Sequence, residues 1–362
     1  MLYYLLFALR DKISFLNIFH YITFRSAMAA ITAFLLSLIF GPMIISMLKK
    51  LKIGEKITKG DSIQLDKLHS NKKDTPTMGG ILILTAIVLS TLLWADILNK
   101  YVILGLFAIL WLGITGFIDD YLKQVKKKSK GLTIVSKFTC QILLGLIIGV
   151  ILFLDPQNST KLDIPFLKNI SLELGIFFII FVIFVITGTS NAVNLTDGLD
   201  GLAIGCVIMA ALAFSILSYV SGNIKFSSYL FIPYLRGSGE LTVFCSAIFG
   251  AGLGFLWFNC YPATVFMGDV GSLALGGALG TVALLIKKEL LLVIVGGIFV
   301  LEAVSVILQV ISFRFFRKRI FKIAPIHHHF QFLGWPESKV IVRFWIIAGL
   351  LALFTLATLK IR

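Results

Sequence analysis

The sequence predicts an all-α protein that crosses a membrane about ten times, for three reasons. First, 58% of the 362 residues are hydrophobic and only 14% are charged, whereas soluble globular proteins are about a quarter charged. Second, the mean hydropathy is +0.97. Third, long continuous apolar runs recur without the alternation of a membrane β-barrel, so helices are the expected spanning elements.

Each predicted span is an apolar window of suitable length, because a bilayer core about 30 Å thick needs roughly 20 such residues per helix. The windows are about 22–48, 77–98, 101–118, 134–154, 172–189, 201–220, 240–258, 270–286, 290–313 and 340–359. We expect one membrane domain over residues 1–362, with the helical bundle over 22–359. The apolar run Leu2–Leu9 is too short to span, so residues 1–20 are expected to lie at the membrane interface.

Basic residues divide unequally between the two sides of this topology. An even number of spans sorts the loops into two sets, and one set carries 21 of the 33 Lys and Arg. Lys and Arg in short loops are retained in the cytoplasm, so this set should face the cytoplasm and both termini should lie outside. The net charge of +15 is explained mainly by this rule, and otherwise by attraction of anionic lipids or phosphorylated substrates. A nucleic-acid partner is not expected, because the sequence has no soluble basic module.

Five carboxylates fall in three loops on the basic side. Asp119 and Asp120 close the third predicted span, where the helix dipole is negative, so helix capping does not explain them. Two adjacent acids at this position need a compensating cation, which is either a metal ion or the lysines that follow. A functional site is therefore the favoured interpretation of this pair.

The other three acids open later spans and have an ordinary alternative explanation. Asp197 and Asp200 lie in Asn191–Gly201, and Asp269 follows Gly268. Asp, Asn and Thr are preferred helix N-caps. Because one cap does not need two Asn, a Thr and two Asp, capping and function are equally good interpretations of the first stretch. For Asp269 alone, capping is the better interpretation.

Three consecutive histidines, His327, His328 and His329, lie in the predicted cytoplasmic loop 314–343. Consecutive side chains cannot all point one way, and their spacing differs from the i, i+4 pair of a zinc helix. A zinc site is therefore not expected. A cluster that contacts phosphates and a simple interfacial loop remain the two interpretations.

Carboxylates, flanking lysines and Asn side chains at one membrane face form the outline of a Mg²⁺–phosphate site. Mg²⁺ prefers a few carboxylates with waters and phosphate oxygens. In phosphoryl transfer the protein supplies mainly positioning and charge neutralisation. A site at the bilayer surface implies one substrate from water and one from lipid.

Six motifs follow one another across nearly the whole chain: Thr75–Gly80, Asp119–Lys123, Lys130–Thr133, Asn191–Ala203, Phe266–Ser272, and Ala324–Phe330 with Gly334 and Trp335. In order and spacing they resemble the phospho-N-acetylmuramoyl-pentapeptide transferases of the polyprenyl-phosphate sugar-phosphate transferase superfamily. The resemblance implies transfer of the sugar phosphate from its UDP carrier to undecaprenyl phosphate, giving lipid I and UMP. It also implies Mg²⁺ as cofactor, a homodimer and the bacterial cytoplasmic (inner) membrane.

The resemblance implies roles for individual residues. Asp119 and Asp120 would be the catalytic pair, with Asp119 as base for the lipid phosphate; an aspartate acting as covalent nucleophile is the alternative. Asp269 would be the magnesium ligand, with Asp119 and Asp120 beside it. The ring of Phe266 would stack on uracil. The other substrate-binding positions would be Lys72 or its neighbour Lys73, Lys123, Lys137, Asn191, Asn194, Asp197, Asp200, Asn259, Gly268, Gln309, His327, His328 and His329.

Two other functions compete with this one. A sister enzyme that transfers N-acetylglucosamine phosphate to a polyprenyl phosphate would share the aspartates, and the three histidines with the following Gly-Trp favour the muramoyl-pentapeptide branch. A secondary transporter would place ionisable groups near the middle of the bilayer. Here only Glu302 is clearly in mid-span, while the other acids lie near span ends.

Overall fold

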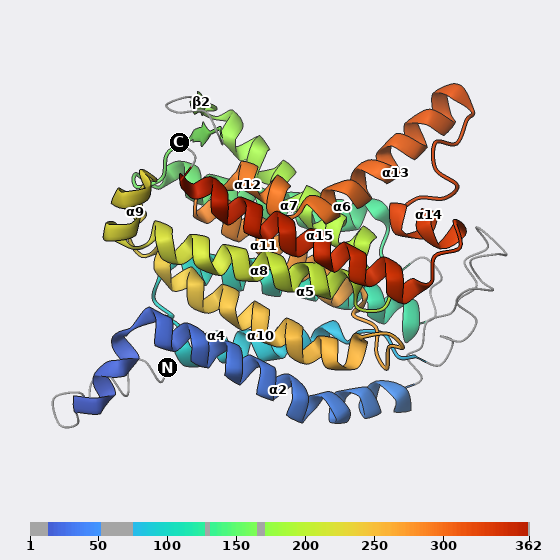
Figure 1. Cartoon of the computed structure of the whole chain (residues 1–362), viewed down its shortest axis with the longest axis horizontal. Helices are drawn as coiled ribbons and strands as arrows, with labels where there is room; N and C mark the ends of the chain where they lie inside the picture. The colour runs from blue at the N-terminus through green and yellow to red at the C-terminus, as the bar shows by residue number, and fades with distance from the viewer. Residues whose placement is uncertain (1–13, 52–74, 127–130, 165–170, 361–362) are drawn as a thin grey trace.

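The fold is a bundle of long helices that lie side by side (Figure 1). The computed structural model describes residues 14–51, 75–126, 131–164 and 171–360. The helices longer than eight residues are α2 (Ile22–Lys50), α4 (Gly80–Trp94), α5 (Lys100–Gln124), α6 (Ile134–Leu154), α7 (Phe177–Thr196), α8 (Leu202–Ser221), α10 (Leu241–Asn259), α11 (Gly268–Leu285), α13 (Gly297–Phe316) and α15 (Glu337–Ala357). The prediction of an all-α membrane protein is thus confirmed.

Nine helices in the described ranges are long and apolar enough to cross a membrane. The one predicted window without such a helix is 77–98. It holds only α4, whose 15 residues extend about 22 Å. Its expected bounds were therefore wrong. Residues before α4 pair instead with the segment before α11: Phe266 N donates to Pro76 O, and Gly79 N to Phe266 O, both at 2.8 Å.

Two other windows also differ from the helices. Window 290–313 is divided, because α12 (Glu289–Val295) ends at Gly296 before α13 begins. Glycine weakens a helix interior, which explains this break. In Figure 1, α13 then diverges from the rest of the bundle. Window 172–189 was predicted to end too early, since α7 continues through polar residues to Thr196.

One end of the bundle carries most of the short elements, and α14 (Ile326–Phe332) lies at the other end (Figure 1). Strand β1 (Lys161–Asp163) pairs antiparallel with β2 (Ser171–Glu173). The beginning of α2 and the end of α15 lie at the same end of the bundle (Figure 1). Residues 1–13 of the predicted interfacial segment lie outside the described residues, and Ser14–His20 form the 3-10 helix η1. The small helices α9 (Ile224–Leu230), α14 (Ile326–Phe332), η3 (Ser238–Glu240) and η4 (Thr358–Lys360) complete the fold.

Small residues allow the central helices to approach closely. Every residue of α11 from Val270 to Leu285 is buried. A β-carbon at Gly116 of α5 would overlap the backbone of Asp269 and Val270. Membrane helices use such small residues because packing, rather than hydrophobicity, holds them together. This contact brings the last turns of α5 beside the first turn of α11.

A buried ion pair joins Arg25 of α2 to Glu240, the last residue of η3. The guanidinium of Arg25 donates to both carboxylate oxygens of Glu240, at 2.6 and 2.7 Å, and to Trp94 O at 3.2 Å. Glu240 Oε2 also accepts from Asp96 N at 2.9 Å. Because Arg25 is only 2% exposed, its charge depends on this carboxylate for compensation.

Replacing Glu240 should therefore destabilise the fold. Glu240→Gln leaves a buried cation uncompensated, a change that costs about 3–5 kcal/mol. Thermal unfolding of the purified protein in detergent should show a clear fall in Tm. The control is Asp155→Asn, which breaks the partly exposed pair with Lys100 (2.6 Å) and should cost about 1 kcal/mol or less. Equal Tm changes in the two variants would contradict this role of the buried pair.

Candidate active site

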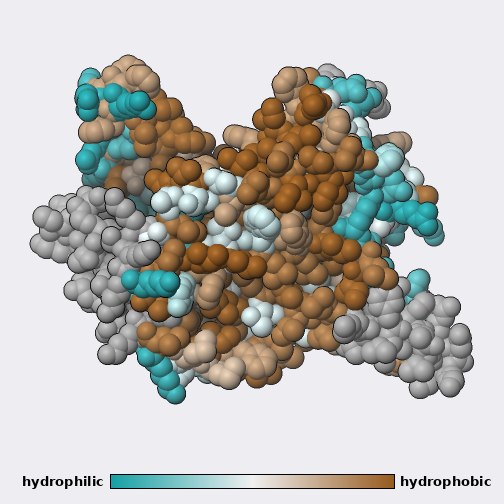
Figure 2. All heavy atoms as spheres, turned by 180° about the vertical axis from the view of Figure 1, so that it is seen from behind, coloured by the Kyte–Doolittle hydropathy of each residue, from teal (hydrophilic) through white to brown (hydrophobic). Residues whose placement is uncertain are grey.

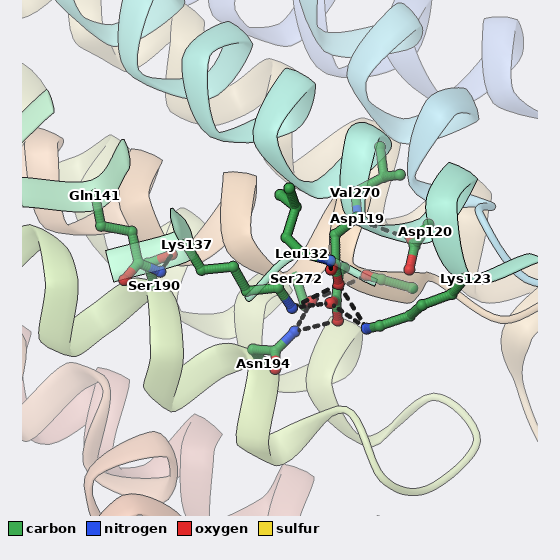
Figure 3. A network of polar contacts seen from close by, with 12 residues as sticks. Asp119, Asp120, Lys123, Leu132, Lys137, Gln141, Ser190, Asn194, Val270 and Ser272 are labelled. Carbon is green, nitrogen blue, oxygen red and sulfur yellow. Dashed lines mark hydrogen bonds and ion pairs between the residues drawn. The ribbon is translucent and has the colours of Figure 1, made fainter. Parts of the chain in front are cut away.

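Three carboxylates, those of Asp119, Asp120 and Asp269, meet where α5 ends and α11 begins. Figure 3 shows Asp119 and Asp120 within the surrounding network of polar contacts. Asp119 and Asp120 come from the last turns of α5 and Asp269 from the first turn of α11. Ligand oxygens of the three side chains lie within 4.8 Å of one another. Asp119 and Asp120 are buried, at 0% and 4% exposure. Such a concentration of negative charge needs nearby cations to be stable.

Two lysines supply positive charge to this cluster, and each bridges the same two carboxylates. Lys123 Nζ lies 2.5 Å from Asp119 Oδ2 and 2.9 Å from Asp269 Oδ2. Lys137 Nζ, from α6, lies 2.6 and 2.5 Å from the same two atoms. The compensating cations expected beside Asp119 are thus lysines in this structure.

The other oxygens of the cluster accept hydrogen bonds that fix their orientation. Asp119 Oδ1 accepts from Leu132 N at 2.7 Å. Asp120 Oδ2 accepts from Val270 N at 3.2 Å. Asp269 Oδ1 accepts from Asn194 Nδ2 at 2.7 Å. These three donors come from the loop before α6, from α11 and from α7, so separate parts of the chain fix the orientation of the carboxylates.

The capping interpretation of Asp269 was wrong. Helix α11 begins at Gly268, and its N-cap residue Met267 makes no side-chain capping hydrogen bond. The side chain that bonds a backbone N–H of the first turn is that of Asp120, not that of Asp269. The Asp269 carboxylate instead contacts Lys123, Lys137 and Asn194. The N-cap of helix α8 is likewise Gly201, which has no side chain, rather than one of the Asn, Thr or Asp residues before it. The capping alternative for the preceding polar stretch therefore also fails.

Asn191 and Asn194 lie on α7, not in the loop expected over 188–200. Asn194 Nδ2 also donates to Ser272 Oγ at 2.8 Å, and Asn191 Nδ2 donates to Gln141 Oε1 at 2.8 Å. The sequence analysis did not select Gln141 or Ser272. A buried glutamine in the apolar window 134–154 was the signal that could have identified Gln141, since such groups need polar partners.

Asp200 and Asn259 organise the loop before α11 instead of joining the carboxylate cluster. Asp200 Oδ2 accepts from Ala263 N at 2.9 Å. Asn259 accepts from Gly201 N at 3.0 Å and donates to Val265 O at 2.8 Å. Asp197 is the partly exposed C-cap of α7. The sequence predicts five acids in the loops on the basic side, and three of these acids, Asp119, Asp120 and Asp269, form the carboxylate cluster.

Other predicted site residues have varied surroundings. Phe266 is partly buried, and its backbone pairs with residues 76–79. Gln309 accepts from Ile320 N and Phe321 N at 3.1 and 3.0 Å, so it fixes the chain after α13. Gly268 has φ +72°, and a β-carbon there would meet Asp120 Oδ2. Lys72 and Lys73 lie outside the described residues.

The histidine triplet does not form one surface. His327 is fully buried, and its Nδ1 lies 3.1 Å from Glu302 Oε2. His328 Nδ1 pairs with Gln331 Oε1 at 2.8 Å, and His329 Nδ1 accepts from Lys322 N at 3.1 Å. The three histidines thus have different partners, although the ring centroids of His327 and His328 lie 4.1 Å apart.

The carboxylate cluster has the chemistry of a Mg²⁺ site. Hard oxygen donors that lie within 4.8 Å of one another match the preference of Mg²⁺ for carboxylates, waters and phosphate oxygens. With every group ionised, three carboxylates outweigh the two lysines by one charge, so the cluster still attracts a cation. Asp269 is the most accessible member, with 16% of its side chain exposed.

The chain matches two family models. Glycosyl transferase family 4 matches residues 102–287, about half of the chain, and includes every residue of the carboxylate–lysine cluster. The phospho-N-acetylmuramoyl-pentapeptide-transferase signature 1 matches residues 72–84. The first match defines the class of protein as a glycosyl transferase, here one built on membrane-spanning helices.

Full-length relatives are more specific. The chain is 53% identical over 363 residues to a phospho-N-acetylmuramoyl-pentapeptide-transferase of Desulforapulum autotrophicum and 55% identical to one of Citrifermentans bemidjiense. Both comparisons cover 100% of each chain. The chain therefore belongs to the phospho-N-acetylmuramoyl-pentapeptide-transferase family, which confirms the resemblance found in its motifs.

Proposed function

We propose that this chain transfers phospho-N-acetylmuramoyl-pentapeptide from its UDP carrier to undecaprenyl phosphate, giving lipid I and UMP for peptidoglycan synthesis. The observation that carries the proposal is the cluster of three carboxylates and two lysines at the ends of spanning helices. Charged groups at that level can meet one substrate from water and another from lipid. Family membership supports this reaction over secondary transport.

The chemical step exchanges one phosphate bond for another. An oxygen of the lipid phosphate attacks the phosphorus that carries the muramoyl sugar, and the bond from this phosphorus to the UMP oxygen breaks. Lys123 and Lys137 bind the phosphates as charged donors. As the phosphates draw these ammonium groups away, Asp119 Oδ2 loses its partners and accepts the proton of the lipid phosphate.

Mg²⁺ is the proposed cofactor. Asp269, with Asp119 and Asp120, would hold it, and when bound it neutralises charge on the diphosphate and on the leaving UMP. Asn194 orients Asp269 for this role through its 2.7 Å hydrogen bond. Phe266, three residues before Asp269 in the sequence, would stack on uracil.

The reaction is tested directly with purified protein in detergent. UMP release should require undecaprenyl phosphate together with the UDP-linked muramoyl-pentapeptide. UDP-N-acetylglucosamine is the matched alternative donor. UMP formed only from UDP-N-acetylglucosamine would replace the proposed function with that of the sister enzyme, and the names of the full-length relatives argue against this result.

We place the carboxylate end of the bundle in the cytoplasm and both termini outside, in the bacterial cytoplasmic membrane. The distribution of Lys and Arg supports this orientation. A homodimer and a single membrane domain over residues 1–362 belong to the same proposal. Analytical ultracentrifugation in detergent would measure the oligomeric state.

Cysteine labelling should establish the orientation. Cys260, which is exposed at the end of α10 near the candidate active site, should react with a membrane-impermeant maleimide only from the cytoplasmic side. A cysteine replacing Ser159, in a Cys260→Ser background, should react only from outside, because Ser159 lies beside β1 at the opposite end. Labelling of both positions from the same side of the membrane would contradict the proposed orientation.

Removing charge from the carboxylate cluster should abolish most turnover. Asp120→Asn and Asp269→Asn should each lower kcat at least about a hundredfold, because each removes charge stabilisation from a metal-assisted site. Mg²⁺ should raise the Tm of the unaltered protein more than that of Asp269→Asn. Asp155→Asn, at the opposite end of the bundle, is the control and should keep normal turnover. Near-normal kcat in either site variant would remove that residue from the catalytic set.

Phe266→Ala should affect binding rather than chemistry. Loss of base–aromatic stacking costs about 1–3 kcal/mol, and the loss should appear in the KM for the UDP donor. Uracil is remote from the reacting phosphorus, so kcat should change little. Phe231→Ala, which removes a highly exposed ring at the other end of the bundle, is the matched control. An unchanged KM together with a lower Tm would show that Phe266 only packs.

A further inference from the structure

A carboxyl group that the proposed reaction does not use is buried within α13. Glu302 and His327 of α14 are both 0% exposed, and Glu302 Oε2 lies 3.1 Å from His327 Nδ1. Neither side chain has a hydrogen bond to another group in the described part of the chain. An ionised carboxylate inside a membrane helix is costly without a partner, so the imidazole is the group that stabilises Glu302.

The opposite edge of the imidazole lies against the turn between α7 and α8. A β-carbon at Gly198 would overlap His327 Nε2 and Cε1, so glycine is required at this contact. Gly198 N donates to Thr196 O at 2.8 Å, which tightens the turn. The imidazole therefore fills the space between the Glu302 carboxylate and the backbone of Gly198.

The two halves of this turn are held by different groups. At its second half, Gly201 N donates to Asn259 Oδ1 at 3.0 Å, and Gly201 O accepts from Trp345 Nε1 at 3.1 Å. Asp200 N donates to Glu337 Oε1 at 3.1 Å. In the first half, Gly198 packs against His327, and Asp197 precedes it as the C-cap of α7. Loss of the imidazole's orientation should therefore disturb the first half and leave the second half in place.

We infer that Glu302 is a positioning residue for the UDP donor: its carboxylate orients His327, and His327 holds the Asp197–Gly198 part of the turn. This inference rests on the proposed function, and on Asp197 belonging to the UDP-donor site, as the family resemblance implies for a substrate-binding position. It also gives the first histidine of the triplet a role different from that of His328 and His329, whose rings are only partly buried. The link joins the diverging helix α13 to the nucleotide side of the active site.

The test is steady-state kinetics on Glu302→Gln, which keeps the shape of the side chain and removes its charge. The KM for the UDP donor should rise about tenfold, while kcat stays within about twofold, because the carboxylate cluster on α5 and α11 is untouched. The double variant Glu302→Gln/His327→Gln should raise KM no further than His327→Gln alone, since the two residues act in series. Additive effects would show separate structural roles and overturn the inference.

Two further variants control for folding and packing. Ser305→Ala removes the neighbouring 2.7 Å bond to Glu302 O within α13 and should leave KM unchanged. Glu302→Asp keeps the charge but withdraws it by one methylene, so its KM should rise only about threefold. If Glu302→Gln does not fold, Glu302→Asp decides the matter, and a donor KM equal to that of the unaltered protein overturns the inference.

Asp197→Asn separates this inference from the proposed function on which it rests. If Asp197→Asn raises the donor KM and Glu302→Gln does not, only the positioning role of Glu302 is overturned. If Asp197→Asn leaves the donor KM unchanged, the turn does not belong to the donor site, and the inference falls with that assignment. A rise in both supports the whole chain from Glu302 to the donor.

Discussion

The sharing of two ammonium groups between Asp119 and Asp269 is the interaction on which the site end of the bundle depends. Lys123 and Lys137 each contact both carboxylates within 2.9 Å. Without these cations, three acids would be crowded together at the ends of spanning helices, where desolvation and mutual repulsion both oppose ionisation. Because the lysines come from α5 and α6, the same contacts also join α5, α6 and α11.

This electrostatic arrangement requires close helix packing. Two carboxylates on different helices share one ammonium only if their backbones are near, and Gly116 permits that approach by leaving room for the backbone of Asp269. Asn194 then reaches Asp269 from α7. A larger residue at Gly116 would separate α5 from α11 and, with them, the carboxylates of Asp119 and Asp269. Close packing of the two helices is therefore a condition for the shared ion pairs.

The sequence predicts the helices well because a spanning segment must satisfy its backbone internally and face lipid, and both requirements are visible in composition. It predicts the gathering of Asp119, Asp120 and Asp269 for a related reason: counting spans assigns each loop to a side. Helix ends are harder to predict. Asn194 looks like a loop residue, but within α7 its amide bonds Asp269 and Ser272, and those partners come from distant parts of the chain.

Partner choice is the part of the site that local sequence cannot specify. Asp200 and Asp269 both precede apolar runs. The Asp200 carboxylate nevertheless accepts a hydrogen bond from Ala263 N, whereas the Asp269 carboxylate forms ion pairs with two lysines. The difference arises from which backbone lies opposite each carboxylate after the helices pack. The same reasoning separates His327, fixed by Glu302, from its two neighbours.

Internal neutralisation has a consequence for substrate binding. In the proposed reaction, the lysines that balance Asp119 and Asp269 also bind phosphate, so a substrate would compete with carboxylates already within 2.9 Å. Part of the phosphate's binding energy is then used to separate existing ion pairs. The released carboxylates are left with excess negative charge, which strengthens their attraction for a divalent cation and their basicity toward a phosphate proton. The groups that keep the site stable without substrate thus become the groups that bind and activate it.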